Sequence, residues 1–150
     1  MPTITLNKKE VLKLAGKNIP DNILHDRIPM LGVPLEELKG NELTIEVFAN
    51  RPDMLTEEGF ARALSSFLNI KPGLRQYKVH PSSYKFTVDK KVKNVRPAVA
   101  AAIITNIKMD DATIKSIMDM QDKLTLTHGR NRKKVAIGIH NLDAITFPVT

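Results

Sequence analysis

The stretch LTIEVFANRPDMLTEEGFARALSSFL, residues 43–68, decides the first part of the fold. Residues 43–48 alternate apolar and polar side chains, which is typical of a strand with one buried face. In residues 57–68 the apolar side chains recur at helical spacing, and this predicts one helix with a wide apolar face. Arg62, Ser65 and Ser66 are expected off that face. A strand that leads into an amphipathic helix predicts an α+β unit.

The turn between this strand and this helix reads Asn50-Arg51-Pro52-Asp53. Asp53 is a candidate N-cap and Pro52 fixes the entry of the chain into the helix. Arg51 is expected to pair with a nearby carboxylate such as Glu46. Because capping and ion pairing explain Asp53 and Arg51, we interpret Asn50, Arg51 and Asp53 as a structural motif, and a direct RNA contact is the less favoured alternative.

Before this stretch, the sequence predicts a short strand at residues 3–6 and a helix that ends at Gly16. Asn7 is in N-cap position, and Glu10 three residues later completes a capping-box pattern. The side chains expected on the buried face of this helix are Val11, Leu12 and Leu14.

A second helix is expected to begin at Asp21, as its cap, and to stop at Pro29. A loop is then predicted at Gly32, Pro34 and Gly40. Together these elements predict a compact N-terminal α+β domain over residues 1–80.

Residues 84–150 have a different pattern. Asp110 or Asp111 is expected to cap a helix that ends near Gly129, at its C′ position. We interpret the region as the opening strands and helix of a larger mixed α/β domain, and as its first part only, because no capping element follows the final residues. The strands are predicted at residues 84–88, 97–107 and 135–139.

The charge is unevenly distributed along the 150 residues, whose formal net charge is +7. Residues 1–82 contain 11 Lys and Arg against 10 Asp and Glu, whereas residues 83–150 contain 12 against 6. The excess of cations in the second part indicates a polyanionic partner, with a solvated basic surface as the alternative of equal weight.

Several classes of site are absent from the sequence. It contains no cysteine, no glycine-rich phosphate loop, no GxSxG sequence and no HExxH sequence. The four histidines do not have the spacing of metal ligands, and no signal peptide or long apolar run is present. We therefore expect a cytoplasmic protein without a membrane span, a metal site or a cofactor of its own.

Two groups of polar side chains remain as candidate binding residues. The basic run at residues 130–134 follows the C-terminus of a predicted helix, where cations are favourable in any case, but it also suits RNA phosphates. His140, with Asn141 and Asp143, follows a predicted buried strand, and ligands collect at the carboxyl ends of strands in α/β sheets. Turn formation explains Asn141 and Asp143 equally well.

Three segments of the chain, in the right order, resemble the β subunit of phenylalanyl-tRNA synthetase in its archaeal and eukaryotic version. The first resembles the family's strand–NRxD–helix signature, the second the entry to its editing domain, and the third the next core strand of that domain. They are EVFANRPDML at residues 46–55, VRPAVAAA at residues 95–102 and VAIGIHNLD at residues 135–143.

The resemblance implies a function and partners. Residues 1–80 would be the B1-like domain, and residues 84–150 the first part of the B3/B4-type editing domain, which hydrolyses tRNA(Phe) mischarged with tyrosine. The implied partners are tRNA(Phe) and the α subunit, in a heterotetramer whose α subunit binds ATP and Mg²⁺. The chain itself would hold no catalytic residue. The implied rim of the editing pocket, near the tRNA 3′ end, comprises Gln121, Arg130, Arg132 and His140.

Two other functions stay open. The chain could be a non-catalytic module that binds RNA or another subunit, or, as the less favoured case, a free-standing editing-like protein. Neither charging of tRNA nor efficient editing is expected of the 150 residues alone.

Overall fold

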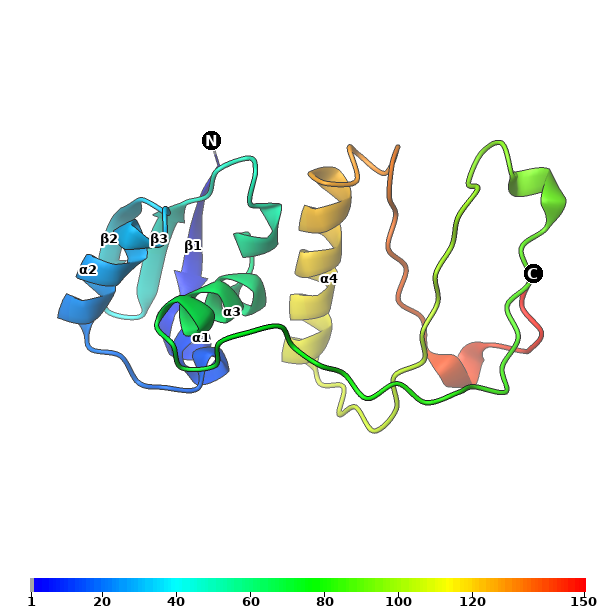
Figure 1. The fold of residues 1–150 in the computed structure, drawn as a ribbon, viewed down its shortest axis with the longest axis horizontal. Helices are drawn as coiled ribbons and strands as arrows, with labels where there is room; N and C mark the ends of the chain where they lie inside the picture. The colour runs from blue at the N-terminus through cyan, green and yellow to red at the C-terminus, as the bar shows by residue number, and fades with distance from the viewer. Residues whose placement is uncertain (1) are drawn as a thin grey trace. The chain divides into compact units, whose positions relative to one another are not determined.

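The structure is a computed structural model, and it describes residues 2–150. The chain divides into two compact units, the first formed by Met1–Arg75 with Asp111–Ile137 and the second by Gln76–Asp110 with Gly138–Thr150. The first unit contains a three-stranded sheet and four α-helices (Figure 1). The α+β class expected from the sequence is therefore confirmed. The domain boundary between residues 80 and 84 stays a prediction.

The sheet is antiparallel, with strand order β1-β3-β2. In its register Leu6 lies opposite Leu43, and Ile4 lies opposite Ile45, so one face is continuously apolar. The β2 strand falls in the region predicted as a loop, because its sequence LEELK carries no alternating pattern and pairing with β3 alone defines it. The strands are β1 Thr3–Asn7, β2 Leu35–Lys39 and β3 Glu42–Glu46.

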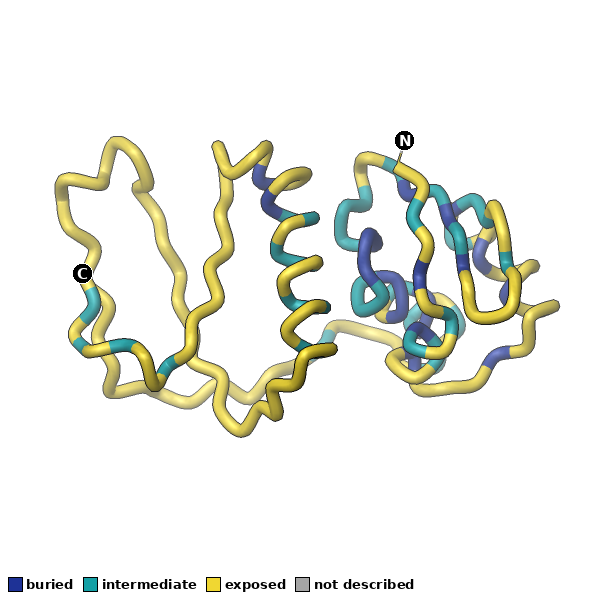
Figure 2. The backbone as a smooth tube through the Cα atoms, turned by 180° about the vertical axis from the view of Figure 1, so that it is seen from behind, coloured by how far each residue is buried: buried dark blue, intermediate teal, exposed yellow. Residues whose placement is uncertain are grey.

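Three helices complete the N-terminal part of the first unit, and α1 packs against α3. They are α1 Lys8–Ala15, α2 Asp21–Met30 and α3 Glu57–Phe67. The buried core lies between these helices and the sheet (Figure 2), and Phe60 of α3 is its largest fully buried side chain. The other core residues are Leu6, Val11, Ala15, Ile19, Leu24, Ile28, Val33, Leu43, Ile45, Val47, Met54, Leu55, Ala61 and Leu64.

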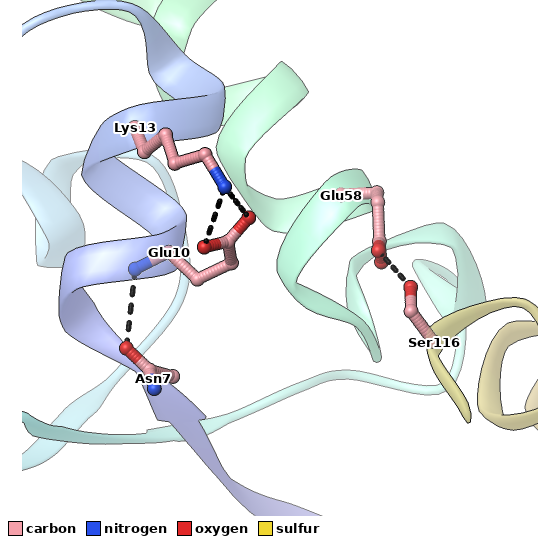
Figure 3. A network of polar contacts seen from close by, with 5 residues as sticks. All are labelled: Asn7, Glu10, Lys13, Glu58 and Ser116. Atoms are coloured by element: carbon pink, nitrogen blue, oxygen red, sulfur yellow. Dashed lines mark hydrogen bonds and ion pairs between the residues drawn. The ribbon is translucent and has the colours of Figure 1, made fainter. Parts of the chain in front are cut away.

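The N-terminus of α1 has the predicted cap but not the complete capping box. The Asn7 side chain accepts a hydrogen bond from the Glu10 backbone N–H at 3.1 Å. The Glu10 carboxylate accepts from Lys13 at 3.0 Å instead of reaching back (Figure 3). The Asn7 backbone N–H donates to the Glu57 carboxylate of α3 at 3.1 Å. Glu57 of α3 thus takes the role that the capping box assigns to Glu10, and its hydrogen bond joins the start of α1 to α3.

The ends of α2 and the buried face of α1 differ from the predictions. Asp21 is the first residue of α2, after the cap position Pro20, and Pro29 lies within the last turn. Pro29 does not stop the helix because the backbone N–H of Leu31 still bonds to carbonyls of the preceding turn. In α1 the side chain of Leu14 is exposed, whereas Ala15 is buried.

Ser65 was expected outside the apolar face of α3, but it is fully buried. Its hydroxyl donates a hydrogen bond at 3.0 Å to the carbonyl oxygen of Ala15, the last residue of α1. Carbonyls at the end of a helix have no partner within the helix. Ser65 therefore satisfies one of them inside the core.

Replacing Ser65 by alanine is expected to destabilise the protein by about 1–2 kcal/mol, because the buried Ala15 carbonyl would lose its partner. Urea unfolding followed by circular dichroism measures this change. Ser66→Ala, on the same helix, is the matched control, since the Ser66 hydroxyl bonds to the Lys71 carbonyl in an exposed position. Equal losses from the two variants would contradict the role assigned to Ser65.

The strands predicted over residues 84–150 are wrong for this structure. Apart from an isolated bridge between Phe86 and Val149, no strand is present there, and α4 Asp111–Leu126 is the one long element. A strand requires a hydrogen-bonded neighbour, and apolar composition alone does not supply one. Residues 97–107 consequently belong to no strand, and the residues of this segment are exposed (Figure 2).

Candidate nucleic-acid interface

The NRPD turn is built around an ion pair between two of its own residues. Asp53 lies in the 3₁₀ turn η1 Pro52–Met54, and its carboxylate accepts hydrogen bonds from Arg51 Nε at 3.0 Å and Nη2 at 2.9 Å. Arg51 therefore pairs with a nearby carboxylate as predicted, but the partner is Asp53 and not Glu46. The predicted capping by Asp53 is wrong. The helix starts later than expected, and Thr56 is its N-cap, accepting from the Gly59 N–H at 3.3 Å.

This pair shifts the titration of both groups. The hydrogen bonds from Arg51 hold the pKa of the Asp53 carboxyl below its ordinary value, and those same bonds raise the pKa of Arg51. Both side chains are more than a third exposed, so solvent screens the pair and its contribution to stability is small. The structural reading of Arg51 and Asp53 thus has a physical basis, whereas Asn50 is exposed and contributes no bond to the pair.

We expect Asp53→Asn to reduce the loss of stability in acid. Because the folded-state pKa of Asp53 is lowered, its contribution is complete above the unfolded value of about 3.9 and disappears as pH falls through the folded value. The test is urea unfolding of both proteins from pH 7 down to pH 2.5. At pH 7 the variant should be less stable by under about 1 kcal/mol, and the two curves should converge in acid. Parallel curves over this range would contradict the prediction.

Helix α4 contacts the N-terminal elements through polar groups. The Ser116 hydroxyl donates to one carboxylate oxygen of Glu58 (Figure 3), whose other oxygen is buried without a hydrogen-bond partner. Lys123 Nζ donates to the Leu55 carbonyl at 2.7 Å and pairs with Asp119 at 2.7 Å. These contacts anchor α4 to α3 and to the end of the NRPD turn.

The basic run after α4 forms a tight loop rather than a continuation of the helix. Arg130, Asn131 and Arg132 have φ values of 50°, 54° and 65°, a left-handed conformation that is unfavourable for each residue. The backbone N–H of Asn131 donates to the Leu126 carbonyl, and that of Arg132 to the Thr125 carbonyl, both at 3.1 Å. The loop therefore folds back and satisfies the last carbonyls of α4.

Gly129 was predicted to end the helix at its C′ position, a place where glycine usually adopts a left-handed φ. The structure instead requires glycine because two backbone carbonyls lie close to its Cα. A Cβ at this position would stand 2.4 Å from the carbonyl oxygens of both Thr125 and Val135. Only glycine lets the chain pass between the helix end and the segment that leaves the loop.

The structure brings three of the four candidate rim residues to the C-terminal part of α4 and its loop. Gln121 is half-buried on the helix, Arg130 is exposed on the loop, and Arg132 pairs with Asp122 at 3.4 Å. His140 belongs to the second unit, where its Nε2 would lie 2.9 Å from a Cβ added to Gly138. Whether these residues act together stays a prediction.

A groove of about 780 Å³ lies between the NRPD turn and the basic loop, within the first unit. Sequence reasoning missed it, because its two walls are about 80 residues apart in the chain. Its lining residues are Pro2, Phe48, Ala49, Asn50, Pro52, Leu55, Thr127, His128, Arg130, Lys134 and Val135.

Among residues 2–150 no group of three or more His, Cys, Asp or Glu side chains is arranged to hold a metal ion. In the same part of the chain, every helix is too short or too polar to cross a membrane.

Comparison with known proteins shows relatives over nearly the whole chain. The chain is 42% identical over 148 residues to the phenylalanine–tRNA ligase β subunit of Methanocorpusculum labreanum, and 42% identical over 149 residues to that of Archaeoglobus fulgidus. Each match covers 99% of this chain and 27% of the relative, so the chain spans about a quarter of the length of these relatives. No family model matches the chain.

A solved structure matches as well. The crystal structure of an N-terminal fragment of the phenylalanyl-tRNA synthetase β subunit from Pyrococcus horikoshii superposes with a TM-score of 0.81 at 30% identity. The match covers 98% of this chain and 44% of the solved chain. The fold is therefore that of an N-terminal piece of an aminoacyl-tRNA synthetase subunit. More particularly, the chain is homologous to the β subunits of archaeal phenylalanine–tRNA ligases, and the resemblance read from the sequence is confirmed.

Proposed function

We propose that this chain acts as the N-terminal part of a phenylalanine–tRNA ligase β subunit, contributing to the tRNA(Phe) aminoacylation complex and to hydrolytic editing of tyrosine-mischarged tRNA(Phe). The observation that carries the proposal is 42% identity to such β subunits over 99% of the chain. In this role the chain binds the α subunit and tRNA(Phe) in a cytoplasmic heterotetramer. ATP and Mg²⁺ serve the parent ligase and not this chain.

The need for editing follows from the limits of an apolar pocket. Such a pocket rejects an isostere with one added hydroxyl by only about 10²-fold. A separate polar site can recognise the hydroxyl of tyrosine and cleave the ester. The parent subunit would supply that site in a domain of which residues 84–150 form the first part.

The exposed apolar segments support this view of residues 84–150. Val99, Ile104 and Ile107 are between 48% and 74% exposed, and the segment that carries them belongs to no strand. Such segments become stable strands when neighbours pair with them. The relatives are nearly four times as long as this chain, so later residues of the subunit are the natural neighbours.

Gln121, Arg130, Arg132 and His140 are the proposed rim of the editing pocket, and none of them is assigned a catalytic step. The arginines can donate two parallel hydrogen bonds to a phosphate, which positions the 3′ end of a tRNA. The loop geometry supports this role, because the backbone N–H of Arg132 bonds to the Thr125 carbonyl of α4 and that of Arg130 bonds to the Thr127 carbonyl just after it.

The test is deacylation of tyrosine-charged tRNA(Phe) by this chain and by a form extended by about 200 residues, a typical domain length. We expect cleavage by the longer form only. In that form Arg130→Ala should slow cleavage by about tenfold, whereas Lys17→Ala, an exposed cation at the end of α1, should leave the rate unchanged. Absence of cleavage by both forms would contradict the proposal.

A second function, a non-catalytic RNA- or subunit-binding module, is favoured by the excess of cations in residues 83–150. It predicts tRNA binding that weakens steeply with salt, without deacylation by either the short or the extended form.

A further inference from the structure

The groove between the NRPD turn and the basic loop combines two kinds of wall. One wall is apolar and comes from the segment that follows β3, with Phe48, Pro52 and Leu55. The other wall carries the polar side chains of the loop after α4, with His128, Arg130 and Lys134. None of the residues that line it is an aspartate or a glutamate.

The apolar wall suits a flat ring. Phe48 is half-buried, so part of this side chain is accessible, and Pro52 also contributes apolar surface to this wall. Stacking of a base on an aromatic side chain contributes about 1–3 kcal/mol and tolerates every base. The volume of about 780 Å³ lies within the range of small-molecule sites.

The polar wall suits an anion. Arg130 is exposed at the groove and has a guanidinium that matches the geometry of phosphate oxygens. Lys134 is fixed by the bond from its backbone N–H to the Gly129 carbonyl at 2.9 Å. Asn50 also lines the groove. It takes no part in the Arg51–Asp53 ion pair, and its side-chain amide can donate a hydrogen bond to a base edge or a ribose hydroxyl.

We propose that this groove binds one unstacked nucleotide, with its base on Phe48 and its phosphate at Arg130 and Lys134. The ligand chemistry is a nucleoside monophosphate, either free or within a single-stranded RNA. In the second case the inference rests on the proposed RNA-binding function and adds a contact from the N-terminal domain. Asn50 then has a binding role in addition to its place in the turn.

The experiment measures binding of two probes, adenosine 5′-monophosphate and a single-stranded oligoadenylate of eight nucleotides, to the 150-residue chain by calorimetry and by NMR of backbone amides. Shifts of the Phe48, Asn50 and Lys134 amides are expected with both probes. If the source is RNA, the oligonucleotide binds more tightly, and the logarithm of its affinity falls with log salt at a slope of about −0.7 for the one phosphate contact.

Two variants test the two walls. Phe48→Leu keeps apolar bulk but removes the ring, and should weaken both probes by about tenfold. Lys134→Gln should weaken both by about tenfold and make the salt slope for RNA shallower. Lys17→Gln, an exposed lysine outside the groove, is the matched control and should change neither. Unfolding curves identify any variant that fails to fold, and Phe48→Tyr, which keeps a ring, should then retain binding.

Three outcomes would overturn the proposal: no amide shifts at the groove, equal effects of Lys17→Gln and Lys134→Gln, or binding of an acidic peptide with the affinity of the nucleotide. Failure here is separable from failure of the editing proposal. Nucleotide binding is read from the amides at Phe48 and Lys134, whereas editing is read from deacylation by the extended form.

Discussion

Replacement of Gly59 by alanine is expected to destabilise the N-terminal domain by about 3 kcal/mol, an overpacking effect at the upper end of the usual range. Gly59 lies in the first turn of α3, where the η1 turn passes directly over the helix. A Cβ at this position would stand 1.6 Å from the Asp53 carbonyl oxygen and 2.8 Å from its carbonyl carbon. Both atoms belong to the backbone, so no side chain can rotate away to make room.

The added methyl group would therefore push the NRPD turn away from α3. The Arg51–Asp53 pair would lose its geometry, and one wall of the nucleotide groove would move with it. Urea unfolding measures the stability, and NMR of the Arg51 and Asp53 amides reports the displacement. Arg62→Ala, an exposed site on the same helix, should change stability by less than about 0.5 kcal/mol. A Gly59→Ala protein as stable as the Arg62→Ala control would contradict the close approach seen here.

Phe60→Ala is expected to cost about 3–5 kcal/mol, the largest effect of a side-chain truncation in this protein. Phe60 is the largest fully buried side chain, and it belongs to the core cluster that α3 shares with α1 and with residues of the sheet. Its removal loses the transfer free energy of the ring and leaves a cavity that the surrounding side chains fill only partly. A small domain has a total stability of about 5–15 kcal/mol, so the variant should be close to unfolding at 37 °C.

Phe67→Ala provides the matched control, since the same truncation occurs seven residues later on the same helix at a ring that is 41% exposed. Its cost should be below about 1.5 kcal/mol, because a substantial part of this side chain is already in contact with solvent. The measurement is the urea midpoint and slope for both variants by circular dichroism. Similar midpoints for the two variants would show that the burial of Phe60 does not dominate the core.

Much of the N-terminal domain could be predicted because its signals are local. Asn7 caps α1 through a hydrogen bond to a residue three positions later, and the apolar period of α3 extends over its whole length. The pattern of residues 43–48 likewise predicts β3. The predictions failed where the partner of a residue is distant. Ser65 bonds to Ala15, 50 residues earlier, and that bond reverses its expected exposure.

The candidate site divides in the same way. The basic run and the NRPD turn are visible in the sequence, as is the resemblance to phenylalanyl-tRNA synthetase β subunits that the relatives confirm. The groove between them is not visible, because α4 must first be held against the NRPD turn by Lys123. The left-handed conformation of Arg130, Asn131 and Arg132 could not be predicted either. No run of three such residues is expected from a sequence that contains no glycine at these positions.

By itself, then, the sequence determined the α+β class, the first strand and its capped helix, the helix of residues 57–67 and the family resemblance. Each of these depends on side chains a few positions apart. Tertiary structure alone decided the strand β2, the Arg51–Asp53 pairing, the burial of Ser65 and the absence of strands over residues 97–107. The physical reason is that backbone and buried polar groups must find hydrogen-bond partners, and the supply of those partners is a property of the folded neighbourhood and not of the local pattern.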